Sequence, residues 1–325
     1  MTAPHGVLLV AWVAVVLGPL VIAYVAWRLL RGGRHRLFWT LVVTSVLGWG
    51  LGVWGFLVEP AGLTVRHVTI ESATWTGPPL RIGVISDTHV AAPHMDLARI
   101  RRVVARMNRA QPDVVMLLGD YAGGHEPAAA RAQVEQSEVL QGVRAFEALR
   151  SPLGTYAVLG NHDSWFDEAA IAEALRGAGV QLLENRAVPV ARPGGSFWIG
   201  GVADLESKRI AASVPATLLD VPTGAPVVLL THWPDPFEAV PERVALTLAG
   251  HTHCGQVDLP ILGRLVHASE ASKRWPCGLY EEEGRKLFVT GGVGVSILPV
   301  RFRAPPEIVI VTLRAPTLAS GRGPH

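Results

Sequence analysis

Short apolar runs typical of buried β-strands recur along this chain of 325 residues, and polar side chains directly follow five of them. The runs and the residues that follow are Leu80–Ser86 with Asp87 and His89, Val114–Gly119 with Asp120, Thr155–Gly160 with Asn161, His162 and Asp163, Val227–Thr231 with His232, and Val244–Ala249 with His251 and His253. In open α/β sheets, sites form at the carboxyl ends of the strands. We therefore expect the five polar clusters to meet at one edge.

The spacing of apolar residues elsewhere favours an α/β fold. Further predicted strands are Phe197–Val202, Leu287–Thr290 and Ile308–Leu313. Apolar side chains at helical spacing occur within Leu97–Met107, Val139–Leu149 and Ile171–Leu175. Strands and helices thus alternate in the first half of this region, whereas the second half consists mostly of strands and turns.

The polar clusters contain a donor set suited to metal ions. Two carboxylates, one amide oxygen and four imidazoles suit borderline or hard divalent ions such as Mn, Fe or Zn. A single histidine at a strand end is commonly a hydrogen-bonded core residue, but five clusters in one register favour ligands. Seven donors exceed one tetrahedral site, so we expect two adjacent ions, the arrangement that in-line phosphoryl displacement uses.

At these residues the sequence resembles the calcineurin-like metallophosphoesterases. The motifs that carry the resemblance are Asp87-Thr-His89, Gly119-Asp120, Gly160-Asn161-His162-Asp163, His232 and Gly250-His251-Thr252-His253. The resemblance implies an α/β fold built as a β-sandwich flanked by helices. It also implies a metal-dependent phosphoric ester hydrolase with two divalent ions as its cofactors and no other cofactor site.

The same resemblance implies a role for each motif residue. One ion would be held by Asp87, His89 and His253, a second by Asn161, His232 and His251, and Asp120 would bridge them. His162 would donate a proton to the leaving oxygen or contact the phosphoryl group, and Asp163 would orient the imidazole of His162. The alternative for Asp163 is a side chain that stabilises a local turn.

The segment Leu298–Glu307, together with Gly255-Gln256, looks like the membrane-associated branch of that superfamily. We therefore expect hydrolysis of a phosphodiester or pyrophosphate, with a lipid-linked or nucleotide-linked substrate. One alternative is the UDP-2,3-diacylglucosamine pyrophosphatase of lipid A synthesis, an activity of some members of that branch. The other is a non-enzymatic metal-binding membrane protein, but such a protein would be expected to have lost a ligand or His162.

Two uncharged or nearly uncharged runs near the N-terminus can each span a bilayer. At ~1.5 Å per residue, helices over Val7–Leu30 and Leu37–Val58 would be about 36 and 33 Å long. A cleaved signal peptide is the alternative, but no basic segment precedes the first run and a second run follows at once. We expect a two-helix transmembrane hairpin over 1–58, a metallophosphoesterase domain over 59–315 and a flexible tail over 316–325.

Charge is distributed unevenly along the chain. Of its 29 basic and 27 acidic residues, residues 1–58 contain four arginines, Arg28, Arg31, Arg34 and Arg36, and no acid. The positive-inside rule then predicts a multi-pass protein of the cell membrane with its catalytic domain on the non-cytoplasmic side. That prediction conflicts with UDP-2,3-diacylglucosamine, whose synthesis the resemblance places in the cytoplasm. The slightly acidic remainder gives no reason to expect a nucleic-acid partner.

Other polar residues have simpler expected roles. The two cysteines, Cys254 and Cys277, are too few for a disulfide framework, and we expect buried thiols. His94 and His125 are expected to lie in loops. The arginines at positions 99, 102, 106 and 109 predict a solvated helix face, with contact to anionic lipid head groups as the alternative.

Overall fold

A computed structural model describes residues 3–91, 94–264 and 266–316, with side chains described from Leu17 onward. The chain divides into two compact units, Met1–Leu57 and Val58–His325. The expected flexible tail over 316–325 lies outside the described residues from position 317 on.

The N-terminal unit consists of helices. Helix α1 (Ala3–Arg31) and helix α2 (His35–Val53) are separated by a turn in which Gly33 has a φ of 68°. Helix α2 continues through a π-helical turn, Trp54–Val58, into the short helix α3 (Glu59–Ala61). Within the described part of the chain, one helical stretch is long and apolar enough to cross a membrane, His35–Ala61, with 27 residues.

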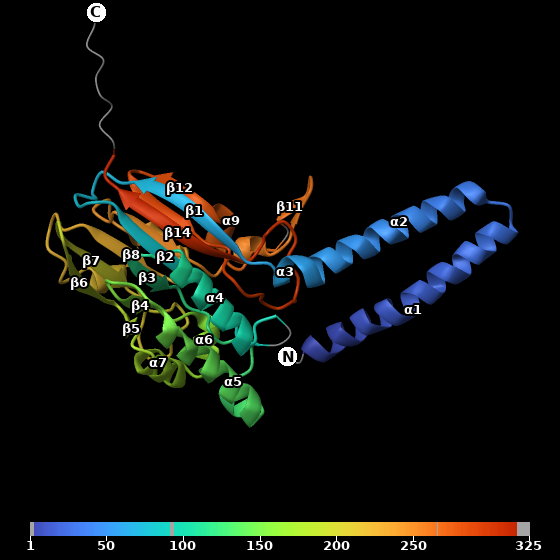
Figure 1. Cartoon of the computed structure of the whole chain (residues 1–325), viewed down its shortest axis with the longest axis horizontal. Coiled ribbons are helices and arrows are strands. Elements are labelled where there is room, and N and C mark those ends of the chain that lie inside the picture. The colour runs from blue at the N-terminus through green and yellow to red at the C-terminus, as the bar shows by residue number, and fades with distance from the viewer. Residues whose placement is uncertain (1–2, 92–93, 265, 317–325) are drawn as a thin grey trace, which may run out of the picture. The chain divides into compact units, whose positions relative to one another are not determined.

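The C-terminal unit contains two six-stranded sheets (Figure 1). The first sheet has the order β1 (Thr64–Glu71), β14 (Glu307–Arg314), β2 (Leu80–Ile85), β3 (Val114–Leu117), β4 (Thr155–Ala157), β5 (Gln181–Leu182). The second has the order β12 (Gly278–Glu282), β13 (Arg285–Val289), β9 (Leu246–Ala249), β8 (Val227–Leu230), β7 (Gly195–Gly201), β6 (Arg186–Arg192). Strands β2 to β5 are parallel to one another, as are β7, β8, β9 and β13, so each sheet has a parallel centre, whereas β14, β6 and β12 pair with these strands in the antiparallel direction.

Shorter elements complete this unit. A two-stranded hairpin is formed by β10 (Asp258–Leu259) and β11 (Gly263–Arg264). The helices are α4 (Leu97–Arg109), α5 (Gln133–Arg144), α6 (Asn161–Phe166), α7 (Glu168–Gly177), α8 (Val214–Thr217) and α9 (Glu270–Arg274). Short 3-10 turns cover Ala128–Ala130, Ala145–Ala148, Asp235–Ala239 and His253–Gly255.

Three buried apolar clusters stack the elements into layers. The first joins one face of the first sheet to helices α4, α5 and α7, which Figure 1 shows along the same side of that sheet. The second lies between the two sheets, where Val84 and Met116 belong to the same cluster as Leu230 and Leu248. The third covers the outer face of the second sheet with residues such as Trp275. The expected α/β fold, a β-sandwich flanked by helices, is confirmed.

All eight predicted strands occur, within a few residues of their expected bounds. Strand β1 was not expected, because its side chains are exposed or half-buried at every position but one and it lies at a sheet edge, where the sequence need not be apolar. The prediction of a solvated arginine face was wrong for Arg99, which is buried. Its guanidinium donates hydrogen bonds to the carbonyl oxygens of Ala61 and Gly62, and so attaches α4 to the end of α3.

Candidate active site

The five predicted polar clusters lie at one edge shared by the two sheets. Asp87 and His89 follow β2, Asp120 follows β3, Asn161 and His162 open α6 after β4, His232 follows β8, and His251 and His253 follow β9. All nine residues predicted for the site, Asp163 included, are buried. The clusters lie at a common edge because the carboxyl ends of parallel strands point in the same direction.

Five of these residues have an unusual backbone conformation. Asp87, His89, Asp120, His251 and His253 all have φ between 42° and 67°. Side chains other than glycine adopt this left-handed region rarely and at a cost in strain. The strain falls on the residues that carry polar side chains into the site, as expected where function fixes the backbone.

One cluster is formed by Asp87, His89 and His253. The Nε2 atoms of His89 and His253 lie 2.9 Å apart, and His253 Nε2 lies 3.5 Å from Asp87 Oδ1. These residues come from two different strand ends, β2 and β9, and their ligand atoms all lie within 4.8 Å of one another. Their donor atoms could hold one divalent ion.

A second cluster contains Asp120, His232 and His251, with Asn161 beside it. His232 Nε2 lies 3.2 Å from both Asn161 Oδ1 and His251 Nδ1. Its other ring nitrogen, Nδ1, donates to the carbonyl oxygen of Leu118 at 2.8 Å, which leaves Nε2 available to the site.

Asp120 lies between the two clusters. Its Oδ2 atom is 3.3 Å from His232 Nε2 and 3.5 Å from His89 Nε2. Its Oδ1 atom accepts a hydrogen bond from the backbone N–H of His162 at 2.9 Å. One carboxylate oxygen therefore faces donors of both clusters, while the other oxygen is fixed by the backbone of α6.

Close packing requires glycine at two motif positions. A Cβ atom on Gly160 would overlap Asp120 Oδ1 and would lie 2.8 Å from His232 Cε1. A Cβ atom on Gly250 would overlap Ser86 Oγ and would lie 2.6 Å from Asp87 Oδ2. These glycines allow the loops to approach closely enough for their side chains to converge.

Burial and neighbouring charges set the protonation of the site. Burial, followed by the charge of His162, lowers the pKa of His89 to about 3, and burial also holds the pKa of His253 well below its usual range. Burial opposes ionisation of Asp120, but the charges of His232 and His162 outweigh it and hold the Asp120 pKa well below normal. An ionised Asp120 and neutral His89 and His253 are the forms that bind metal ions. Burial opposes the charged form of His232, but the charge of Asp120 raises the His232 pKa to about 10, so an ion held by His232 would displace a proton from it.

The donor set fits two divalent ions. Oxygen and imidazole donors predominate, the donors are buried, and one carboxylate oxygen faces both clusters. His251 faces the second cluster through Nδ1, and its Nε2 atom is buried and lacks a hydrogen-bond partner within the described part of the chain. The residues that would hold the ions are Asp87, His89, Asp120, Asn161, His232, His251 and His253.

His162 is positioned by its surroundings to face the two clusters. Its Nδ1 atom lies 2.7 Å from the carbonyl oxygen of Gly124, and its Nε2 atom lies 4.0 Å from Asp120 Oδ2. The rings of Trp165 and His125 pack against it, with centroids 4.6 and 4.9 Å away. The prediction that His125 is a loop residue missed this contact, because the loop returns to the site only in the folded chain.

The contacts of Asp163 differ from those expected for it. Its carboxylate does not hold the His162 ring, which is hydrogen-bonded to Gly124 instead. The Asp163 oxygens accept hydrogen bonds from the backbone N–H groups of residues 120, 121, 122 and 160, at 2.8–3.0 Å. Asp163 therefore fixes the backbone that carries Asp120, which is closer to the alternative of a side chain that stabilises local structure.

Two supporting residues were not predicted. Asp204 is buried and accepts hydrogen bonds from Ser164 Oγ at 2.7 Å and Trp233 Nε1 at 2.8 Å, and the Trp233 ring packs against His251 with centroids 3.6 Å apart. Arg301 is fully buried and donates to the carbonyl oxygens of Gly291 and Ala304, and one of its nitrogens lies 3.3 Å from His253 Nδ1. Asp204 stands outside the motifs identified in the sequence, and the segment Leu298–Glu307, which contains Arg301, did not indicate the contact with His253.

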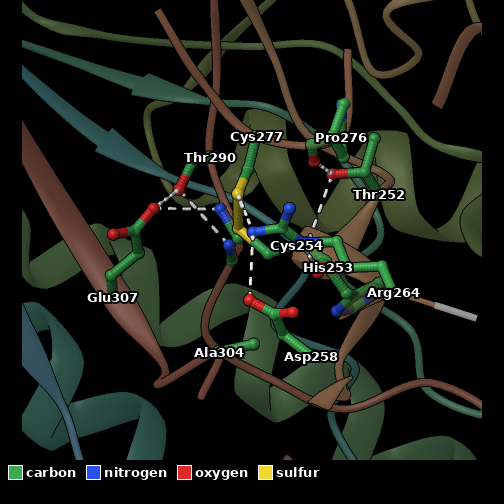
Figure 2. Close-up of a disulfide and its surroundings, with 12 residues drawn as sticks. Thr252, His253, Cys254, Asp258, Arg264, Pro276, Cys277, Thr290, Ala304 and Glu307 are labelled. Atoms are coloured by element: carbon green, nitrogen blue, oxygen red, sulfur yellow. Dashed lines mark hydrogen bonds and ion pairs between the residues drawn. A yellow bond between two sulfur atoms is a disulfide. The ribbon is translucent and has the colours of Figure 1, made fainter. Parts of the chain in front are cut away.

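The two cysteines form a disulfide next to the site, which corrects the expectation of buried thiols. Cys254 directly follows His253 and pairs with Cys277, at a Cα–Cα distance of 5.1 Å (Figure 2). Arg264 Nε donates to the Cys254 carbonyl oxygen at 2.7 Å. The prediction failed because counting cysteines does not show that residues 23 positions apart return to one point.

Known proteins with similar sequences are phosphoesterases, which agrees with the geometry of this site. The family model for calcineurin-like phosphoesterases matches residues 80–255. The chain is 31% identical over 272 residues to a metallophosphoesterase of Aquifex aeolicus, covering 81% of this chain and 96% of that protein. The fold and site define a metal-dependent phosphoester hydrolase. The chain belongs to the calcineurin-like phosphoesterase family.

Two further relatives extend the comparison. Phosphodiesterase YaeI of Escherichia coli is 30% identical over 288 residues, covering 86% of this chain and 98% of that protein. A zebrafish (Danio rerio) protein described as a transmembrane protein with metallophosphoesterase domain is 28% identical over 299 residues, covering 87% of this chain. The present chain matches 64% of the length of that relative.

Proposed function

We propose that this chain is a membrane-anchored phosphodiesterase that uses two divalent ions to hydrolyse a phosphodiester or pyrophosphate bond. The observation that carries the proposal is Asp120 Oδ2, which faces imidazole nitrogens of both clusters at 3.3 and 3.5 Å. When bound, the two ions would supply Lewis-acid stabilisation of the phosphoryl oxygens and a nucleophile near neutral pH.

The protein's own residues have separate tasks in this proposal. His162 holds a proton at Nε2 for the leaving oxygen, while its Nδ1 atom is fixed by the Gly124 carbonyl oxygen. Asp163 keeps the Asp120 backbone in place through its four hydrogen bonds. The rings of Trp165 and Trp233 pack on His162 and His251 and restrict their motion.

Diester or pyrophosphate substrates are proposed in preference to monoesters. The relative in Escherichia coli named a phosphodiesterase supports this choice. A membrane anchor would confine the site close to lipid head groups, so a lipid-linked substrate fits it, as does a nucleotide-linked one. Complete ligand clusters and His162 argue against a non-enzymatic metal-binding protein.

The anchor is proposed as a two-helix transmembrane hairpin that places the catalytic domain outside the cytoplasm. The candidate span His35–Ala61 and the arginine-containing connection around Gly33 support it. The Cys254–Cys277 disulfide gives independent support, because disulfides persist mainly in oxidising compartments. An external domain would not meet UDP-2,3-diacylglucosamine in the cytoplasm, so we do not favour that substrate.

Paired assays test the reaction class. Purified full-length protein is loaded with Mn, Zn or Fe and given bis-p-nitrophenyl phosphate or p-nitrophenyl phosphate. A phosphodiesterase should have the higher kcat/KM for the diester. Preference for the monoester would contradict the proposed substrate class, and hydrolysis of neither compound with metal bound would contradict general diesterase activity.

A further inference from the structure

Large apolar side chains are exposed on two segments next to the candidate active site. Ile261 and Leu262 lie at the tip of the β10–β11 hairpin, where Ile261 is fully exposed and Leu262 is 66% exposed, and Val266 follows the hairpin with 61% of its surface exposed. Ile297 and Leu298 lie on a second segment, with exposed fractions of 77% and 40%. We call these five residues the apolar rim. Single exposed apolar residues are common, but a group on adjoining segments indicates a contact surface.

Hydrogen bonds join the two segments. Gln256, just before the hairpin, donates from Nε2 to the carbonyl oxygen of Leu298 at 3.2 Å, and its Oε1 atom accepts from the backbone N–H of Ser296. The backbone N–H of Asp258 donates to the carbonyl oxygen of Phe302 at 2.9 Å. The apolar rim is therefore carried by one connected piece of structure.

The apolar rim borders the catalytic residues. Ser296 Oγ lies 3.5 Å from His162 Nε2, and Ile297 is the next residue along the chain. The hairpin also follows closely in the chain on the turn formed by residues 253–255, which contains the ligand candidate His253. A surface that the apolar rim contacts would lie close to the reacting phosphoryl group.

The backbone conformation of Ile261 and Ile297 indicates that these residues do more than pack against the protein core. Ile261 has a φ of 75° and Ile297 has a φ of 62°, in the left-handed region. Residues branched at Cβ avoid this region, where glycine or asparagine would be unstrained. Both isoleucine side chains are nonetheless exposed, so neither is retained there by contact with the core.

The end of the candidate membrane span indicates what covers the apolar rim. The span His35–Ala61 ends in α3, where the carboxylate of Glu59 accepts a hydrogen bond from the backbone N–H of Ala304 at 2.7 Å. Ala304 is two residues from Phe302, which pairs with the hairpin. The point where the chain would leave the bilayer and the apolar rim are thus attached to the same segment.

We propose that the apolar rim inserts into the surface of the lipid bilayer beside the active site. The site then faces phosphoesters in the head-group region of the membrane. This inference rests on the membrane anchoring proposed above and adds a second membrane contact, made by the catalytic unit itself. Apolar side chains inserted at the interface gain free energy from leaving water, in proportion to their buried area.

Fluorescent labelling tests the contact on the full-length chain. The native cysteines are paired, so a single introduced cysteine can carry an environment-sensitive dye. The labelled positions are Ile261→Cys in the apolar rim, Val46→Cys in α2 as a span reference, and Leu219→Cys as a control. Leu219 is 81% exposed and lies shortly before the start of β8, whose other end carries His232.

The labelled proteins are reconstituted in liposomes of phosphatidylcholine and phosphatidylglycerol, with or without nitroxide-labelled phosphatidylcholine. We expect the nitroxide lipid to quench most of the fluorescence at positions 46 and 261 and little of it at position 219. Quenching at 46 with position 261 behaving like 219 would overturn the bilayer contact and leave the anchor intact. Absence of quenching at 46 would overturn both.

A functional comparison provides a second test. Ile261→Ser combined with Ile297→Ser should slow hydrolysis of a phosphodiester presented in liposomes several-fold more than hydrolysis of soluble bis-p-nitrophenyl phosphate. Leu219→Ser, which also removes an exposed apolar side chain, should leave both rates unchanged. Equal slowing of both substrates by the double variant, or no slowing of either, would overturn the proposal.

Discussion

At the scale of single residues, His162 differs from the other histidines of the site. One ring nitrogen is fixed by the Gly124 carbonyl oxygen, and the other faces the site 4.0 Å from Asp120 Oδ2. We expect His162→Ala to lower kcat for bis-p-nitrophenyl phosphate by about 10²–10⁴-fold, the usual contribution of a general acid, without loss of bound metal.

Steady-state kinetics and elemental analysis of the same preparations check this prediction. His125→Ala is the matched control, because the His125 ring also packs on His162 but its side chain is exposed. It should have a much smaller effect. If His162→Ala lost metal in parallel with activity, His162 would be a ligand rather than a proton donor.

Sequence patterns predicted which polar residues come together at the strand ends but not how these residues are supported. Asp87 and His253 follow apolar strands at recognisable spacing, so their positions can be read along the chain. The carboxylate of Asp163 accepts from backbone groups about 40 positions earlier, and Arg301 reaches His253 from 48 positions away, and no local pattern reports such contacts. The carboxylate of Asp163 contacts backbone N–H groups and not the His162 ring expected for it, and a part for Asp163 in the site stays a prediction.

At the scale of elements, the turn from β4 into α6 depends on Gly160. A Cβ atom there would overlap Asp120 Oδ1, so Gly160→Ala must displace Asp120, His232 or both. We expect loss of most bound metal and of activity, measured by elemental analysis and diesterase assay. Gly177→Ala, in α7, is the control, because no atom lies within 4 Å of the added Cβ position. If the Gly160→Ala variant bound as much metal as the Gly177→Ala variant, the close approach of Gly160 to Asp120 would not matter for the site.

The disulfide gives a second prediction at this scale. It closes a loop between residues 254 and 277 that contains the β10–β11 hairpin and α9. Replacing both cysteines by serine should lower the free energy of unfolding by about 2–4 kcal/mol, as loss of a disulfide of this loop length does. Urea unfolding with and without reductant measures this effect.

Reductant should destabilise the native protein to the same extent and leave the double serine variant unchanged. Equal stability of the native protein with and without reductant would contradict a structural role for the bond.

Central elements of the fold could be predicted, and edge elements could not. Strands β3 and β8 are buried at every position and form continuous apolar runs. Strands β2 and β9 differ from them only at the exposed Arg81 and the buried Thr247. Strand β1 is exposed or half-buried at every position but one, and the residues of β10 and β11 are half-buried, so their sequences lack that signal. Helix α4 was predicted by its apolar face, and only the folded chain explains why Arg99 is buried behind α3.

At the scale of the whole molecule, the proposed topology predicts an external C-terminus. A reporter that is active only outside the cytoplasm, fused after residue 325, should give signal, whereas a cytoplasm-specific reporter at the same position should not. The arginine-rich connection and the disulfide both favour this outcome. A cytoplasmic C-terminus would contradict the topology and reopen cytoplasmic substrates.

The most direct measurement is the metal content and diesterase activity of purified protein with and without Asp120→Asn. Native protein should bind about two divalent ions per chain, as a two-metal hydrolase does. Because Asp120 Oδ2 faces both clusters, the variant should lose bound metal and bis-p-nitrophenyl phosphate hydrolysis together. Full retention of both by Asp120→Asn, or native protein that binds no metal, would contradict a dinuclear site bridged by Asp120.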